Sequence, residues 1–299
     1  IHSVLLVPMR FRHKVIGVLG VVNRSDGKPF SETDMDLLQA LADQASMPVH
    51  YAKFSVALDE KRRLDYDLGI AKKIQMALLP KDVPQIGGVD LAAFSVPAQQ
   101  VGGDYYDFLD VDENHVGIVI ADVSGKGISG AIVMSICRSI LRVEAPGCLS
   151  PATVLKKVNR ILSRDLSEDV FISVLYMILN RKTRELTVAR GGHPYPILNS
   201  GSGEPSTLKS GGLAMGLADP ATFDEMLEEK TVVINPGDVV VAYTDGVTEA
   251  RNADEEELGE ERLRRLLLEQ AHDLEGLLAT VFAAVDAFSG SEPQTDDLT

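Results

Sequence analysis

Four aspartates of this 299-residue chain stand where charged side chains are uncommon. Asp104 follows two glycines, and Asp122 follows an apolar stretch at residues 116–120. Asp245 lies between another apolar stretch and a glycine, while Asp296 opens an Asp-Asp pair after a long polar segment. Because a buried carboxylate is costly unless it is paired or binds a metal, we expect these side chains to share a bound cation.

The chemistry of such a group follows from its donor atoms. Aspartates at strand ends can converge at one edge of a sheet, and neighbouring glycines let the backbone approach a ligand. Oxygen ligands without His or Cys suit Mg²⁺ or Mn²⁺ rather than Zn²⁺. Two such ions about 4 Å apart can activate a water molecule and hold a phosphoryl group for in-line attack. Taken singly, the same motifs are more often ordinary turns or solvated acidic pairs, so only their combination indicates a metal site.

The stretch before Asp122 predicts the central element of the fold. Its apolar and β-branched residues are typical of a strand buried on both faces. A glycine-rich loop follows, and then apolar residues at helical spacing from Ile132 to Leu141. Ser150 and Pro151 predict the start of another helix. The whole pattern predicts an α/β domain, with strands at 89–98, 171–179 and 185–190 and on both sides of 235–237, and helices at about 260–271 and 273–288.

The first part of the chain has a pattern of its own. Residues 3–8 and 14–22 predict two strands of a hairpin around a basic turn. Ser31 and Asp34 predict a helix start, with Asp in the reciprocal position of a capping box. Pro48 is expected to kink or interrupt this helix because proline lacks a backbone donor.

A second, long helix is predicted at residues 51–80. Its positions at heptad spacing are Leu64, Leu68, Ala71, Gln75 and Leu78. Such a seam suits a short coiled coil, and it suits an amphipathic helix packed on its own domain equally well. In the first case, two copies of the chain would pair through this helix in a parallel dimer.

Composition limits the classes of partner. The net charge of −15 argues against nucleic acid or an anionic membrane surface, which both require a basic footprint. No apolar run reaches about 18 residues, so no membrane-spanning helix is expected in this span, and the first residues lack the features of a signal peptide. Cys137 and Cys148 do not make a disulfide framework. This low cysteine use favours a cytoplasmic location.

The N-terminal pattern resembles the C-terminal half of a GAF sensor domain. The hairpin, the sequence VIGVLGVVNR, a loop, FSETD and an amphipathic helix carry the resemblance, which covers residues 1–50. The alternative is an unrelated pair of strands with a helix. The other half of a GAF domain would form most of its ligand pocket, so the ligand is not identified. Because Ile1 lies inside an expected strand and Thr299 where another begins, we expect a piece of a longer protein.

Five motifs resemble the SpoIIE-like branch of the metal-dependent PPM protein phosphatases, from about residue 70 to the end. In chain order they are GGDYYDF, ADVSGKG, GGHPYP, YTDGVTEARN and DDLT. The resemblance implies a four-layer αββα phosphatase domain. The expected organisation is a partial GAF domain at 1–50, a helical linker at 51–84 and the phosphatase domain at 85–299 with its last strand truncated.

The resemblance also implies roles for particular residues. The implied metal ligands are Asp104, Asp122, the backbone carbonyl of Val123, Asp245 and Asp296. Asp122 would bridge two Mn²⁺ or Mg²⁺ ions, with Asp297 as a neighbour of the site. The implied reaction is hydrolysis of phosphoserine or phosphothreonine by metal-bound water, without a phosphoenzyme.

Other residues of these motifs are not expected to bind metal. Lys126 stands where the family often has His, and we expect no loss from it. His193 is expected to be a structural turn residue rather than a proton donor, and Tyr105 and Tyr106 are expected to pack. The pair at 251–252, Arg-Asn, would line the substrate edge or lie in an exposed loop.

Three functions remain open from the sequence. The first is an active phosphatase controlled by the GAF part, the second a catalytically silent PPM-like regulatory scaffold, and the third a GAF-linked nucleotide cyclase. For the first, the resemblance implies a bacterial partner-switching pathway, in which the substrate is a phosphorylated STAS-type anti-anti-sigma protein. The signal at the GAF domain, a small molecule or a protein, is not identified.

Overall fold

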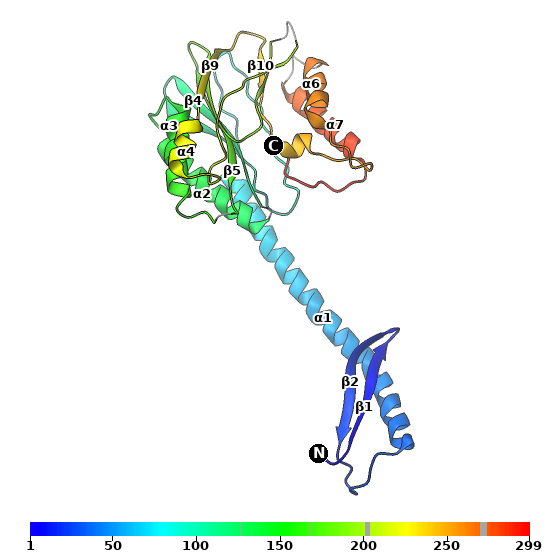
Figure 1. Cartoon of the computed structure of the whole chain (residues 1–299). Helices are drawn as coiled ribbons and strands as arrows, with labels where there is room; N and C mark the ends of the chain where they lie inside the picture. Colours follow the sequence, from blue (N-terminus) through cyan, green and yellow to red (C-terminus); the bar gives the residue numbers. More distant parts are fainter. Residues whose placement is uncertain (126, 168, 201–203, 270–273) are drawn as a thin grey trace. The chain divides into compact units, whose positions relative to one another are not determined.

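The computed structural model describes residues 1–125, 127–167, 169–200, 204–269 and 274–299 (Figure 1). Lys126, for which no loss is expected, therefore lies outside the described residues. The chain divides into two compact units, Ile1–Leu68 and Gly69–Thr299. Within the described ranges, no helix combines the length and the apolar character needed to cross a lipid bilayer.

The N-terminal unit is built on the predicted hairpin. Strands β1 (Val4–Phe11) and β2 (Lys14–Val22) pair antiparallel, and helix α1 (Glu32–Leu78) follows them. The capping box forms with aspartate. The Ser31 N–H donates to the Asp34 carboxylate at 2.8 Å, and the Asp34 N–H donates to Ser31 Oγ at 3.3 Å. The buried core of this unit consists of Val7, Met9, Leu38 and Ala42.

Helix α1 is continuous through Pro48, so of the predicted kink or interruption the interruption does not occur. Proline removes one backbone donor and crowds the preceding turn. A helix of 47 residues retains its hydrogen-bond ladder on both sides of this single defect. The helices predicted before and after Pro48 are therefore one element, and this element crosses the boundary between the two units.

A five-stranded antiparallel sheet is the centre of the C-terminal unit. In spatial order its strands are β3 (Tyr105–Asp112), β4 (His115–Val123), β5 (Ile172–Asn180), β6 (Glu185–Gly191) and β9 (Glu229–Val233). Strand β4 lies between β3 and β5 and is buried along most of its length, as its apolar sequence predicts. The helices on one face of this sheet are α2 (Ile128–Glu144), α3 (Pro151–Leu162) and α4 (Pro220–Met226).

A second sheet completes this unit. Its strands, in spatial order, are β10 (Val239–Val241), β7 (Ile197–Asn199) and β8 (Ser206–Thr207). The helices beside it are α6 (Gly259–Glu269) and α7 (Leu274–Ser289), on the side opposite α2, α3 and α4 (Figure 1). A short helix, α5 (Asp245–Thr248), follows β10. The order of layers is helix, sheet, sheet, helix, which confirms the expected αββα fold class.

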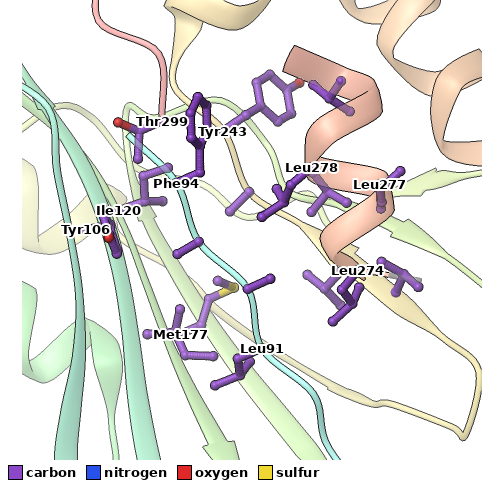
Figure 2. A pocket seen from close by; sticks show the side chains of 18 of the residues that line it. Leu91, Phe94, Tyr106, Ile120, Met177, Tyr243, Leu274, Leu277, Leu278 and Thr299 are labelled. Atoms are coloured by element: carbon purple, nitrogen blue, oxygen red, sulfur yellow. The ribbon is translucent and has the colours of Figure 1, made fainter. Parts of the chain in front are cut away.

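Residues 89–98 do not form the predicted strand; isolated bridges join Val89 to Ile86 and Val96 to Leu298. Side chains of this segment, including Leu91 and Phe94, instead line a mainly apolar cavity of about 250 Å³ (Figure 2). The opposite walls include Ile120, Met177, Tyr243, Leu274 and Leu277. The apolar side chains of the segment are half-buried where they line this cavity, and the segment does not pair as a strand, so its composition was misleading.

An ion pair attaches helix α2 to strand β3. Arg142 donates to both carboxylate oxygens of Asp107, at 2.6 and 2.7 Å, and the Tyr105 hydroxyl donates to the same carboxylate at 2.8 Å. The Asp107 side chain is fully buried, whereas that of Arg142 is 43% exposed. The pair therefore fixes α2 against the strand that begins directly after Asp104.

We predict that Arg142→Leu lowers the free energy of unfolding by about 2 kcal/mol, because it leaves the buried Asp107 carboxylate without its cation. The control is Arg265→Leu, since Arg265 pairs with Glu261 on the surface and both side chains are more than 70% exposed. The Arg265→Leu change should lower the free energy of unfolding by less than about 0.5 kcal/mol. Urea unfolding of both variants measures the difference, and equal small effects would contradict the structural role of the buried pair.

Candidate metal centre

The predicted carboxylates stand at strand ends and in the last segment of the chain. Asp104 precedes β3 by one residue, Asp122 is the penultimate residue of β4, and Asp245 is the first residue of α5, shortly after β10. Asp296 lies in the segment that follows α7. Each residue is thus carried by a different part of the C-terminal unit.

The neighbouring aspartates lie close enough to Asp122 to affect its protonation. Burial raises the pKa of Asp122 to about 7, and the negative charges of Asp245 and Asp296 add to this shift. Burial and the charge of Asp122 also raise the pKa of Asp104 well above its ordinary value. The structure therefore brings together the four aspartates that the sequence analysis singled out.

Two glycines permit this close approach. A Cβ atom on Gly103 would lie 2.6 Å from the carbonyl oxygen of Val123 and 3.4 Å from Oδ1 of Asp122. A Cβ atom on Gly246 would overlap the carbonyl oxygen of Asp297. Any larger residue would push the segments apart. The carbonyl of Val123, the predicted backbone ligand, thus faces the Gly-Gly-Asp loop.

Asp297 has a role that the sequence analysis did not assign. Its buried carboxylate accepts hydrogen bonds from the backbone N–H groups of Ala98 and Gly103, both at 2.7 Å. These bonds hold the Gly-Gly-Asp loop against the end of the chain. The adjacent Asp296 is less buried and acts on Asp122 through its charge. An Asp-Asp pair in a sequence does not show which member binds backbone.

Gln75 attaches helix α1 to the same loop. Its side-chain amide donates to the carbonyl oxygen of Gly102 at 2.6 Å, and the Gly102 N–H donates to Gln75 Oε1 at 3.1 Å. Gln75 is buried in these contacts, so this heptad position packs on its own unit. The polar Gln75 among apolar heptad positions was a signal in the sequence that this side chain has a special contact. Its partner, Gly102, lies 27 residues away and could not be identified from the sequence.

His193 and the two tyrosines have structural surroundings. His193 is completely buried, and its Nδ1 hydrogen-bonds with Ser173 Oγ at 2.8 Å. Burial lowers the pKa of the imidazole to about 3, so the ring is neutral at pH 7. Tyr105 donates to Asp107, and Tyr106 packs against the hydrophobic core. These contacts support packing roles rather than proton transfer.

Arg251 lies at the edge of the candidate site. With Gly246 and Asp296 it lines a pocket of about 110 Å³. Its guanidinium pairs with Glu257 at 3.0 Å, and its side chain is 53% exposed. Arg251 thus lies near Asp296, and its place at a substrate edge stays a prediction. Asn252 instead accepts hydrogen bonds from backbone groups of its own turn.

The donor set suits a hard divalent cation. Its members are carboxylate oxygens and a backbone carbonyl, the ligands that Mg²⁺ and Mn²⁺ prefer. Across the described ranges, no three Asp, Glu, His or Cys side chains already form a ready-made metal site. The raised pKa values of Asp104 and Asp122 instead report mutual repulsion in a buried place. A divalent cation would remove that repulsion, so the residues present fit such an ion.

Comparison with known families gives two matches. The model of the family described as stage II sporulation protein E (SpoIIE) matches residues 112–299, and the GAF domain model matches residues 1–49. Phosphoserine phosphatase RsbU of Bacillus subtilis (strain 168) is 34% identical over 195 residues, which are 64% of this chain and 56% of RsbU. Protein IcfG of Synechocystis is 30% identical over 237 residues, 70% of this chain and 36% of IcfG. The chain thus spans about half of RsbU and about a third of IcfG.

Solved structures share the fold. The SiaA-PP2C domain of Pseudomonas aeruginosa has a TM-score of 0.70 at 23% identity, covering 80% of this chain and 96% of that domain. RsbX in complex with magnesium has a TM-score of 0.50 at 14% identity, covering 69% and 89%. At these identities the likeness shows that the C-terminal unit has the layered fold of PP2C-type domains.

We predict that His193 makes the C-terminal unit less stable in acid. The unfolded imidazole has a pKa of about 6.5 and the folded one about 3. Below pH 6.5 the unfolded chain therefore binds the extra proton, and the free energy of unfolding falls by about 1.4 kcal/mol per pH unit. His193→Gln should remove this component. Urea unfolding at pH 7.5 and 5.5, with hydrogen exchange of β5 amides as the local probe, compares the two proteins; identical pH dependence would refute a buried neutral histidine.

Proposed function

The chain belongs to the SpoIIE family, and we propose that it is a metal-dependent protein phosphatase acting on phosphoserine or phosphothreonine. One observation carries the proposal: aspartates from distant segments surround Asp122 closely enough to help raise its pKa to about 7. A purely structural cluster gains nothing from such repulsion. A site for divalent cations requires such a group of carboxylates, because each ion needs several oxygen ligands within reach.

In this proposal Asp122 would be a ligand shared by two ions, Mn²⁺ or Mg²⁺. Asp104 and the backbone carbonyl of Val123 would be further ligands. Asp245 would bind the second ion, and Asp296 would complete the set. Bound ions of this kind supply an activated water and neutralise charge on the phosphoryl oxygens. A solved structure with the same fold is that of RsbX in complex with magnesium, which supports the choice of cation.

The protein's own residues would orient the reactants. Gln75 and Asp297 hold the Gly-Gly-Asp loop by hydrogen bonds to its backbone, which keeps Asp104 beside Asp122. Arg251 reaches the pocket next to Asp296, where it would contact the segment that carries the phosphorylated residue. The proposed reaction is hydrolysis by a water molecule, which would release phosphate without a phosphoenzyme; bound ions would supply the activation of that water.

We predict that Asp122→Asn lowers phosphatase turnover by more than about 100-fold, since a bridging ligand matters more than an outer-shell partner. The assay is phosphate release from p-nitrophenyl phosphate and a phosphoserine protein with Mn²⁺, Mg²⁺ or EDTA. Asp110→Asn is the matched control, because its side chain is 94% exposed, and it should keep full activity. Near-wild-type rates in metal-saturated Asp122→Asn would contradict the bridging role.

The proposed substrate is a phosphorylated STAS-type anti-anti-sigma protein in the bacterial cytoplasm. The relative RsbU is named a phosphoserine phosphatase, which supports phosphoserine as the substrate group. The alternatives predict different outcomes. A silent scaffold would bind its partner without metal-dependent turnover, and a nucleotide cyclase would convert GTP or ATP in the same metal buffers.

Regulation is proposed to run from the GAF part at 1–50 through the linker at 51–84. Residues 51–67 of α1 are all exposed, and they include several large apolar side chains. These are Tyr51, Phe54, Val56, Leu58, Leu64 and Tyr66. Water-exposed apolar side chains on one helix favour pairing with a second helix. This supports a homodimer through the linker.

We predict that the chain is a dimer by light scattering, and that Leu64→Glu weakens it at least about tenfold by placing a charge in the seam. Ser55→Glu is the matched control. Ser55 is also exposed, and a separation of nine residues places it on the opposite face of the helix. A monomeric wild type, or equal effects of both changes, would contradict the proposed seam.

A further inference from the structure

Thr244, the residue before Asp245, lies where three segments of the C-terminal unit meet. It is completely buried. Its hydroxyl donates to Oδ2 of Asp104 at 2.8 Å and accepts a hydrogen bond from the Thr299 N–H at 3.1 Å. The Thr244 N–H donates in turn to the Thr299 carbonyl oxygen at 3.1 Å. One side chain thus connects the Gly-Gly-Asp loop, the segment after β10 and the end of the chain.

The direction of the hydroxyl proton follows from its neighbours. A hydroxyl has one hydrogen to donate, and the Thr299 N–H already occupies the accepting side of the oxygen. Two acceptors are within reach: the Asp104 carboxylate at 2.8 Å and the carbonyl oxygen of Asp297 at 3.4 Å. The bond at 2.8 Å has the better length for a hydroxyl donor, and the contact at 3.4 Å is too long for a strong one. The proton therefore points at Asp104.

Helix capping, the usual role of a threonine at this position, does not explain the hydrogen bonds of the Thr244 side chain. Thr244 is the N-cap residue of α5, a position where a threonine hydroxyl usually accepts a hydrogen bond from the first turn of its helix. Here the hydroxyl makes no such bond. It is directed instead at a residue 140 positions earlier in the chain.

We infer that Thr244 is a positioning residue, whose hydroxyl fixes the orientation of the Asp104 carboxylate toward Asp122 and so sets the affinity of the site for divalent cations. This inference deepens the proposed function and rests on it. Outer-shell hydrogen bonds orient ligands before the ion arrives, and their loss typically weakens metal binding roughly 10–100-fold.

Two matched variants separate the hydroxyl from the shape of the side chain. Thr244→Val keeps the branched shape and removes the donor, and Thr244→Ser keeps the donor and removes a methyl group. Calorimetric titration with Mn²⁺ should show roughly 10–100-fold weaker binding for Thr244→Val and a change below about threefold for Thr244→Ser. At saturating Mn²⁺, KM for the phosphoserine protein should be the same in both.

A merely structural role makes a different prediction. Both variants would then lower Tm of the metal-free protein while binding Mn²⁺ as tightly as the wild type, which would overturn the inference. If Thr244→Val does not fold, Thr244→Ala takes its place. The alanine also lacks the hydroxyl donor to Asp104, so Mn²⁺ binding should be weaker than in Thr244→Ser, and binding as tight as in Thr244→Ser would overturn the inference. A wild type that binds no Mn²⁺ and releases no phosphate refutes the proposed function itself, which distinguishes the two failures.

Discussion

Negative charge concentrated in a small, partly buried volume is the constraint on which the C-terminal unit depends. Asp104 and Asp122 are both buried enough, and close enough to each other, that their pKa values rise. Such a group costs free energy in the absence of a cation. The fold tolerates this cost because its strands and turns hold the carboxylates in place, and glycines at 103 and 246 leave room for the crossing backbone.

Hydrogen bonds from remote segments hold one loop in particular. The Gln75 side chain from α1 makes two hydrogen bonds with the backbone of Gly102. The Asp297 carboxylate accepts a hydrogen bond from the Gly103 N–H, and the Thr244 hydroxyl donates one to the Asp104 carboxyl group. The loop is therefore attached to the linker helix, to the segment after β10 and to the end of the chain. Gln75 belongs to the part of α1 that lies in the C-terminal unit, so this end of the helix helps to hold the loop that carries Asp104.

Much of this arrangement was predictable because it rests on local patterns. The apolar run before Asp122 gave strand β4, since a central strand must be apolar on both faces. Ser150 caps α3 through the Thr153 N–H at 3.0 Å, as the Ser-Pro pair indicates. The four aspartates were identifiable from their positions beside glycines and apolar strands.

The remainder depends on contacts between distant residues. The apolar segment 89–98 reads as a strand, but it lines a cavity and does not pair as a strand. Pro48 is accommodated because a long helix survives one missing hydrogen bond. The partners of Asp297 are separated from it by 199 and 194 residues, and no pattern in the sequence links them. For the same reason Thr244 could not be identified as a donor to Asp104 before the fold was known.

The most direct test of the proposed metal centre is anomalous X-ray diffraction from crystals of the whole chain grown with Mn²⁺. We expect two manganese peaks about 4 Å apart, with Asp122 between them and Asp104, Asp245 and Asp296 as the other carboxylate ligands. Peaks elsewhere on the protein, or none among these four aspartates at saturating Mn²⁺, would contradict the claim that the carboxylates were gathered to bind metal.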